Sequence, residues 1–124
     1  MTQQTGMTTQ DVAARFHELA QQEKWFEIQD ELFADDVRSI EPRTAKGLPN
    51  AQGKDAVRRK GEAIVSQVEA VHRASTTAPV VGGNFFAVGR ALDMTLRGVG
   101  RTQMNEVTMY EVKDGKIVLE QFFY

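Results

Sequence analysis

The sequence predicts an α+β fold, with helices first and an antiparallel sheet after them. Apolar residues recur at helical spacing in the first third of the chain and again over residues 54–68. Long strand-like runs follow, and Asp114-Gly115 separates the last two of them. Such a pair is typical of a two-residue hairpin turn, because both of its residues adopt positive φ. After a disordered lead over residues 1–7, residues 8–124 are expected to form one domain with a single core.

Two helices are expected near the N-terminus. Thr8 and Asp11 form a capping-box pattern, so the first helix should run from Thr8 or its neighbour to about Glu23. The second helix should span about residues 25–33, and a short strand should follow over residues 37–41.

The middle of the chain should hold a loop, a third helix and a strand. Residues 43–53 contain two Gly, one Pro and one Asn, which argues against any regular element there. This loop is either a lid over a pocket mouth or a plain connector. The helix should span about residues 54–68 and carry Lys60 on its apolar stripe, and the strand should cover about residues 70–80.

The turn at Asp114-Gly115 determines which side chains share a face of the sheet. It places Lys113 opposite Lys116, and regular alternation then puts Tyr110 opposite Leu119. Side chains alternate between faces along a strand, so each face can be read from this register. The same count pairs Thr108 with Gln121, Glu106 with Phe123, Leu92 with Glu106 and Arg90 with Thr108.

The two faces of this sheet differ in composition. The more apolar, inner face should be covered by helices, and it collects Phe86, Val88, Arg90, Leu92, Met94, Met104, Glu106, Thr108, Tyr110, Val112, Ile117, Leu119, Gln121 and Phe123. The outer face includes Val107, Met109, Val118, Glu120, Phe122 and Tyr124. Its apolar members form a sizeable patch, which indicates a partner surface. We therefore expect a homodimer through the outer face of the sheet.

Composition argues against several partners and chemistries. The formal net charge is −2 and there is no basic stripe, so nucleic acid is not an expected partner. The chain has no Cys, hence no disulfides and no thiolate chemistry. Without an apolar leader or a bilayer-spanning stretch, we expect a cytoplasmic protein with no membrane partner. His17 and His72 lack a metal-ligand spacing, and no glycine loop suits a phosphate, so neither metal nor other cofactor is expected.

Four short segments carry a resemblance to a known fold family. They are Leu32-Phe33-Ala34-Asp35-Asp36-Val37, Gly53-Lys54-Asp55-Ala56-Val57, Phe86-Ala87-Val88 and the run from Glu106 to Ile117, whose Tyr-x-Val-x-Asp-Gly-Lys-Ile pattern is the most specific. In order and spacing they make the sequence resemble the nuclear transport factor 2-like superfamily, in its SnoaL-like branch, from about Thr8 to Tyr124. The resemblance implies a cone-shaped α+β roll, in which N-terminal helices pack on a curved sheet and leave a pocket at the open end. It also implies dimers through the outer sheet face.

The resemblance leaves the reaction open. Relatives include polyketide cyclases, ketosteroid isomerases, limonene epoxide hydrolases, dehydratases and non-catalytic binding modules, and a shared fold does not fix a function. The Tyr that the isomerases use early in the chain is missing, since no Tyr precedes Tyr110. Arg90 and Glu106 share a face but do not complete the Asp–Arg–Asp set of the epoxide hydrolases. SnoaL itself uses an Asp as its acid–base, whereas the nearest inward carboxylate here is Glu106, at a different position.

Glu106 is the leading catalytic candidate. A carboxyl group among Leu, Met and Phe should have a raised pKa, which suits a general acid or base near neutral pH. Alternatively, Lys60 or Arg90 neutralises it in a structural ion pair. Lys60 is the second candidate, and it either pairs with Glu106 or Glu41, binds a substrate anion, or reaches into solvent. Tyr110 is the third, and it either donates to an oxyanion or is a core residue.

The remaining candidates would contact a ligand without reacting with it. They are Glu41, Arg90, Leu92, Thr108, Gln121 and Phe123. Two functions stay open for a protein with such a pocket. One is a cofactor-free isomerase, cyclase, dehydratase or hydrolase acting on a small, largely apolar molecule. The other is a non-catalytic module that binds a ligand or a protein partner.

Overall fold

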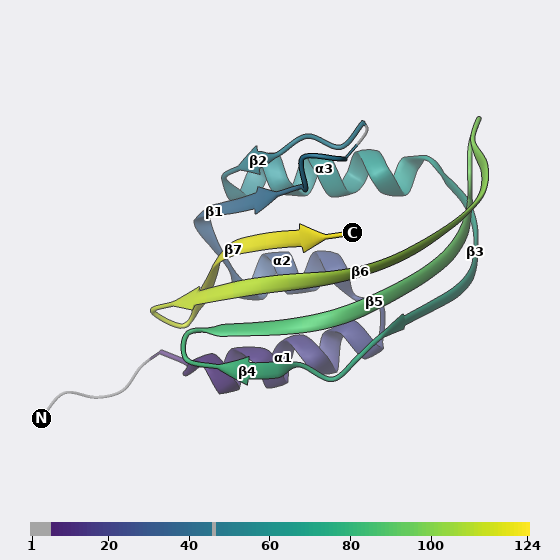
Figure 1. Ribbon diagram of the computed structural model, residues 1–124. Coiled ribbons are helices and arrows are strands. Elements are labelled where there is room, and N and C mark those ends of the chain that lie inside the picture. The colour runs from purple at the N-terminus through teal and green to yellow at the C-terminus, as the bar shows by residue number, and fades with distance from the viewer. Residues whose placement is uncertain (1–5, 46) are drawn as a thin grey trace, which may run out of the picture.

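A computed structural model describes residues 6–45 and 47–124 (Figure 1). Within these residues the elements are α1 (Thr9–Gln21), α2 (Trp25–Leu32), β1 (Phe33–Ile40), β2 (Ala51–Gln52), α3 (Lys54–Ser66), β3 (Val68–Thr76), β4 (Val80–Gly82), β5 (Phe85–Leu96), β6 (Gly100–Lys113) and β7 (Lys116–Phe123). The predicted α+β class is confirmed. Most of the predicted N-terminal lead, residues 1–5, lies outside the described residues.

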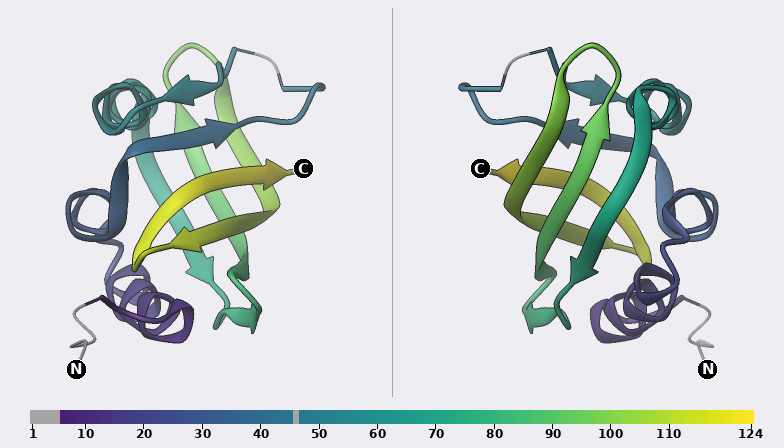
Figure 2. Two further views of the ribbon diagram at one scale, coloured as in Figure 1. Left: turned by 90° about the vertical axis from the view of Figure 1, so that its left-hand side faces the viewer. Right: turned by 90° about the vertical axis from the view of Figure 1, so that its right-hand side faces the viewer.

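The described strands form one curved sheet in the order β2-β1-β7-β6-β5-β3, with β4 paired to β5. The β1–β7 pair is parallel and all other pairs are antiparallel. Figure 2 shows the helices on one side of this sheet, which curls around them. The face toward the helices is called the inner face below, and the opposite face is the outer face.

Helix α1 supplies most of the helical contribution to the core. Its capping box is complete, since the Thr8 amide donates to Asp11 Oδ2 at 3.0 Å and the Asp11 amide donates to Thr8 Oγ1 at 3.1 Å. The Phe16 ring lies 5.2 Å from the Phe86 ring and 4.7 Å from the Tyr110 ring, measured between centroids. The predicted apolar stripe is therefore the buried face of α1, with Val12, Phe16, Leu19 and Ala20.

The hairpin turn between β6 and β7 has the predicted geometry. Asp114 has a φ of 52° and Gly115 a φ of 75°, and Lys113 lies opposite Lys116. A Cβ atom at Gly115 would lie 2.9 Å from the Met7 amide nitrogen, so a side chain there would clash as well as strain the backbone.

A β-bulge beyond this turn overturns the predicted register of β7. Val112 pairs with Ile117 but Glu111 pairs with Leu119, which leaves Val118 as an extra residue. The bulge reverses the alternation from there on.

The predicted faces of the last strand were therefore right at Ile117 and wrong from Leu119 on. Leu119, Gln121 and Phe123 face outward, because they pair with the outer residues Glu111, Met109 and Val107 of β6. Glu120 and Phe122 face inward, opposite Tyr110 and Thr108 respectively.

The predicted faces of β5 and β6 are confirmed, although the pairing was wrong by two positions. Arg90 lies opposite Glu106, and Leu92 opposite Met104. The three-residue loop between Leu96 and Gly100 is shorter than the predicted turn, and this accounts for the shift. An even shift leaves every side chain on its own face.

Two predictions about regular elements also need correction. Ala51–Gln52 pairs with β1, so the segment predicted as irregular contains a short strand. The strand predicted over residues 70–80 is divided into β3 and β4, with Pro79 in the gap. Proline has no amide hydrogen for the ladder, which favours an interruption at this point.

Candidate functional site

Lys60 is the centre of a network of polar side chains on the inner face. Its Nζ lies 2.5 Å from Glu41 Oε2 and donates to Ser39 Oγ at 3.0 Å. The side chains of Lys60 and Glu41 are only 7% and 5% exposed, so Lys60 does not reach into solvent. The ammonium group also lies 5.2 Å from the centroid of the Phe122 ring. Of the alternatives for Lys60, the structure shows a buried ion pair with Glu41.

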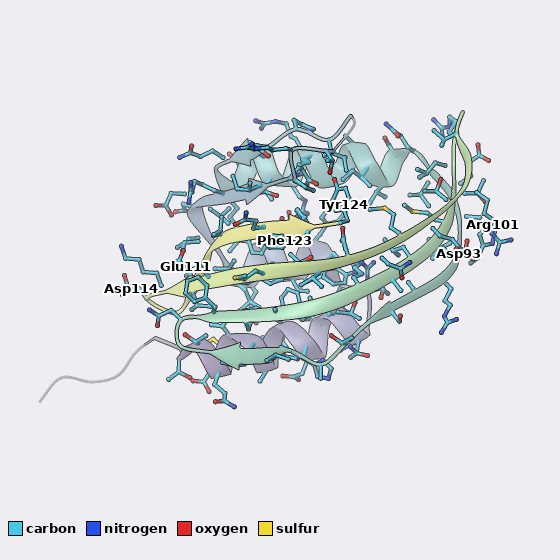
Figure 3. All side chains as sticks on the ribbon, in the orientation of Figure 1. Asp93, Arg101, Glu111, Asp114, Phe123 and Tyr124 are labelled. Atoms are coloured by element: carbon cyan, nitrogen blue, oxygen red, sulfur yellow. The ribbon has the colours of Figure 1, made fainter. Side chains whose placement is uncertain are left out.

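The network continues from β1 to β7. Ser39 Oγ donates to Glu120 Oε1 at 2.9 Å, because these residues are neighbours in the parallel β1–β7 pair. The Tyr124 hydroxyl donates to Glu41 Oε1 at 2.8 Å, and Figure 3 shows Tyr124 just beyond the end of β7. Ser39, Glu41, Lys60, Glu120 and Tyr124 are called the inner polar cluster below.

Burial makes ionisation costly within this cluster. It raises the pKa of Glu120, an effect that the Ser39 hydrogen bond and the nearby Lys60 oppose. Burial, followed by the hydrogen bond to Glu41, raises the pKa of the Tyr124 hydroxyl. Both groups therefore favour their neutral forms over a wider pH range than in solution.

Glu106 stands beside the cluster without being part of it. Burial raises its pKa to about 7, the Glu41 carboxylate adds to this, and Arg90 opposes it. The predicted direction of this pKa shift is confirmed. The Glu106 carboxyl group makes no hydrogen bond or ion pair with any side chain among residues 6–45 and 47–124.

Arg90 is engaged by residues other than Glu106. Its Nη2 donates to Glu23 Oε1 at 2.9 Å and its Nη1 donates to Thr76 Oγ1 at 2.9 Å. The guanidinium carbon lies 4.2 Å from the centroid of the Trp25 ring. The structural ion pairs expected for Glu106 with Lys60 or Arg90 are therefore not formed, since both cations bind other carboxylates.

The other sequence candidates lie in three different places. Tyr110 and Thr108 are buried in the core, with exposed fractions of 3% and 1%. Leu92 is on the inner face and partly buried. Gln121 and Phe123 are on the outer face, so predicting them as inward ligand contacts was wrong. The cause is the bulge at Val118, which no turn or alternation rule signals.

Sequence reasoning missed three members of the inner polar cluster. Ser39 had a usable signal, because it lies two residues from both Val37 and Glu41 and so shares their face of β1. Glu120 had none, since its inward position depends on the bulge. Tyr124 lies beyond the last strand and is held by its bond to Glu41.

The comparison of sequences identifies the family. The family model of the SnoaL-like domain matches residues 7–124. The chain belongs to this family. No curated protein matches the chain. The resemblance found in the sequence motifs is thus confirmed for this SnoaL-like chain.

Solved structures agree with the family assignment. A SnoaL-like protein of Mesorhizobium loti, provisionally named a polyketide cyclase, is 35% identical, with a TM-score of 0.88 over 95% of this chain and 100% of that one. A nuclear transport factor 2-like protein of Burkholderia thailandensis is 14% identical, with a TM-score of 0.78 over 94% and 90% of the two chains. TerC, co-crystallised with polyporic acid, is 12% identical, with a TM-score of 0.71 over 94% and 90%. The last two show likeness of fold alone.

A depression in the surface of this SnoaL-like chain lies apart from the inner polar cluster. An open depression of about 320 Å³ at the start of α3 is lined by Asp35, Lys54 and Arg59 among others, and none of its lining residues belongs to the inner polar cluster.

Among the described residues, no helix is long and apolar enough to cross a membrane.

Proposed function

We propose that this protein binds a small, largely apolar molecule against the inner face of its sheet and converts it without a cofactor, using Glu106 as a general acid–base. The observation that carries the proposal is the state of Glu106, a partly shielded carboxyl group with a pKa of about 7 and no side-chain partner among residues 6–45 and 47–124. Such a group both accepts and returns a proton near neutral pH. Isomerisation, cyclisation, dehydration and hydrolysis all need this step.

The surroundings of Glu106 suit an apolar ligand. Leu92 and Met104 lie opposite each other on the inner face, and Ile64 belongs to α3 on the same side of the sheet. All three are only partly buried, which leaves apolar surface for a ligand to cover. TerC, which shares the fold, was co-crystallised with a small organic molecule.

The other catalytic candidates receive indirect roles in this proposal. Lys60 is bound to Glu41 and Ser39, so it stabilises negative charge on the ligand through its field and does not transfer protons. Tyr110 stacks on Phe86 in the core and lies opposite Glu120 in the β6–β7 pair, so it helps to position that carboxyl group.

The test starts from a ligand found by thermal-shift screening, since a ligand that prefers the native state raises the melting temperature. With that compound, Glu106→Gln should lower kcat by a factor of about 10² to 10⁴ while the thermal shift remains. Glu111→Gln, on the outer face of the same strand, is the matched control and should leave kcat unchanged. Full turnover by Glu106→Gln would contradict the proposal.

A non-catalytic binding module is the second candidate. The surroundings of Lys60 and Tyr110 favour it, because Lys60 already pairs with Glu41 and Tyr110 is a buried core residue. Mass spectrometry of the ligand recovered after incubation separates the two candidates. An intact compound supports binding alone, and a chemically changed compound supports catalysis.

We also propose a homodimer through the outer face of the sheet. Val107 and Phe123 lie opposite each other there and are 48% and 45% exposed, and Phe85 on β5 is 42% exposed. These apolar side chains form a patch that a second copy would cover. Light scattering should give twice the chain mass for the native protein and a single chain mass for Val107→Glu. A native protein that runs as a monomer would rule out this assembly.

A further inference from the structure

Arg90 and Glu106 are placed as an ion pair, yet they do not form one. They are directly opposite in the β5–β6 ladder and both face inward. Side chains at such positions have Cβ atoms about 4.5–5.5 Å apart, so an arginine reaches a glutamate there easily. The guanidinium group instead binds Glu23, at the end of the turn that follows α1.

Several contacts hold Arg90 in that position. Two of its nitrogens lie 2.9 Å and 3.4 Å from the two carboxylate oxygens of Glu23. Thr76 Oγ1 accepts a further hydrogen bond, and the guanidinium group lies over the Trp25 ring. The Trp25 indole also donates to Glu23 Oε1 at 2.9 Å, which fixes the carboxylate. The Arg90 side chain is 14% exposed in this arrangement.

We propose that Glu23 is a positioning residue that holds Arg90 away from Glu106 and so keeps the Glu106 carboxyl group unpaired. This inference rests on the role of Glu106 proposed above, because an unpaired carboxyl group is what acid–base chemistry requires. A glutamate tied to an arginine remains ionised and loses its capacity to exchange protons near neutral pH.

Among the described residues around Glu106, Arg90 is the cation able to neutralise it. Glu41 after β1 and Glu120 on β7 are carboxyl groups that raise its pKa. Tyr124 also interacts with it electrostatically, and its hydroxyl is bound to Glu41. Lys60 on α3 is a second cation that acts on Glu106, and its ammonium group is bound to Glu41 and Ser39.

The test measures the pKa of Glu106 in the full, ligand-free chain by following the side-chain carboxyl ¹³C resonance with pH, assigned by its loss in Glu106→Gln. Glu23→Gln should lower this pKa by about one pH unit or more, since a released arginine can pair with Glu106. Arg90→Gln should raise it, because the opposing cation is gone. In the Arg90→Gln background, adding Glu23→Gln should have no further effect.

A matched control is the pair between Arg15 and Glu31, which joins α1 to α2 with Arg15 nitrogens 2.6 Å and 2.9 Å from the carboxylate oxygens. Glu31→Gln should leave the Glu106 pKa unchanged. Thr76→Val, which removes one hydrogen bond of Arg90, should lower the pKa in the same direction by a smaller amount.

The inference is overturned if Glu23→Gln leaves the Glu106 pKa unchanged, or changes it equally without Arg90. This measurement needs no substrate. Its failure is therefore distinct from the failure of the catalytic proposal, which depends on turnover by Glu106→Gln.

Discussion

Helices α1 and α3 make different kinds of contact with the same sheet. Both α1 and α3 have 13 residues and lie on its inner side. Helix α1 buries five residues, including Phe16 against the Phe86 and Tyr110 rings. Helix α3 buries one, Val57, and sends Lys60 to Ser39 and Glu41.

Because of this difference, α1 contributes mainly to stability and α3 contributes mainly to the placement of charges. The contacts of α1 are apolar and buried, so they contribute hydrophobic stabilisation. The contacts of α3 are charged, and a buried ion pair offsets much of its attraction by desolvation. We conclude that the α1 end stabilises the fold, whereas the α3 end holds charges in place beside Glu106.

The largest expected effect is a loss of stability at the α1 end. Phe16→Ala should lower the free energy of unfolding by about 4 kcal/mol, because it removes a fully buried aromatic ring from the core. Urea denaturation followed by circular dichroism measures the change. Ile64→Ala on α3, where the side chain is only partly buried, is the control and should cost less than half as much. Equal losses would contradict the contrast between the helices.

A somewhat smaller effect is expected at the α3 end. Lys60→Met should lower the free energy of unfolding by about 3 kcal/mol, because the Glu41 carboxylate stays buried without its cation. Lys54→Met on the same helix removes a side chain that donates to the backbone carbonyl of Asp30, and it should have little effect. If Lys60→Met is no worse than Lys54→Met, the buried pair is not the structural centre of this end.

The smallest effect concerns Glu106 and depends on pH. Its folded-state pKa of about 7 is above that of the unfolded chain, so its burial favours folding below the unfolded pKa. That contribution is lost as the pH rises through 7. Relative to wild type, Glu106→Gln should therefore gain about 1–3 kcal/mol above pH 8 and nothing below pH 4.

Chemical denaturation at a series of pH values measures this gain. Glu111→Gln, on the outer face of β6, is the matched control for this substitution. A gain that does not vary with pH in Glu106→Gln would mean that the carboxyl group is not shielded.

Local patterns were sufficient where structure depends on near neighbours. The capping box at Thr8 and Asp11 and the positive φ angles of Asp114-Gly115 need no distant contact, and both are as expected. The faces of β5 and β6 followed from alternation, so Arg90 and Glu106 were placed on one face correctly. Lys60 was directed at the sheet by helical spacing alone.

The sequence by itself thus determined the α+β class, the extent of most elements and one inward carboxyl group. Only the tertiary structure decided which residues of β7 face inward and which charged side chains form pairs. A single extra residue, Val118, exchanges Gln121 and Phe123 for Glu120 and Phe122 on the inner face. The partners of Lys60 and Arg90 lie 19 and 67 positions away along the chain, at Glu41 and Glu23. These pairings depend on which charged groups compete for each other in the folded interior. The spacing of residues along the chain does not reveal the outcome of that competition.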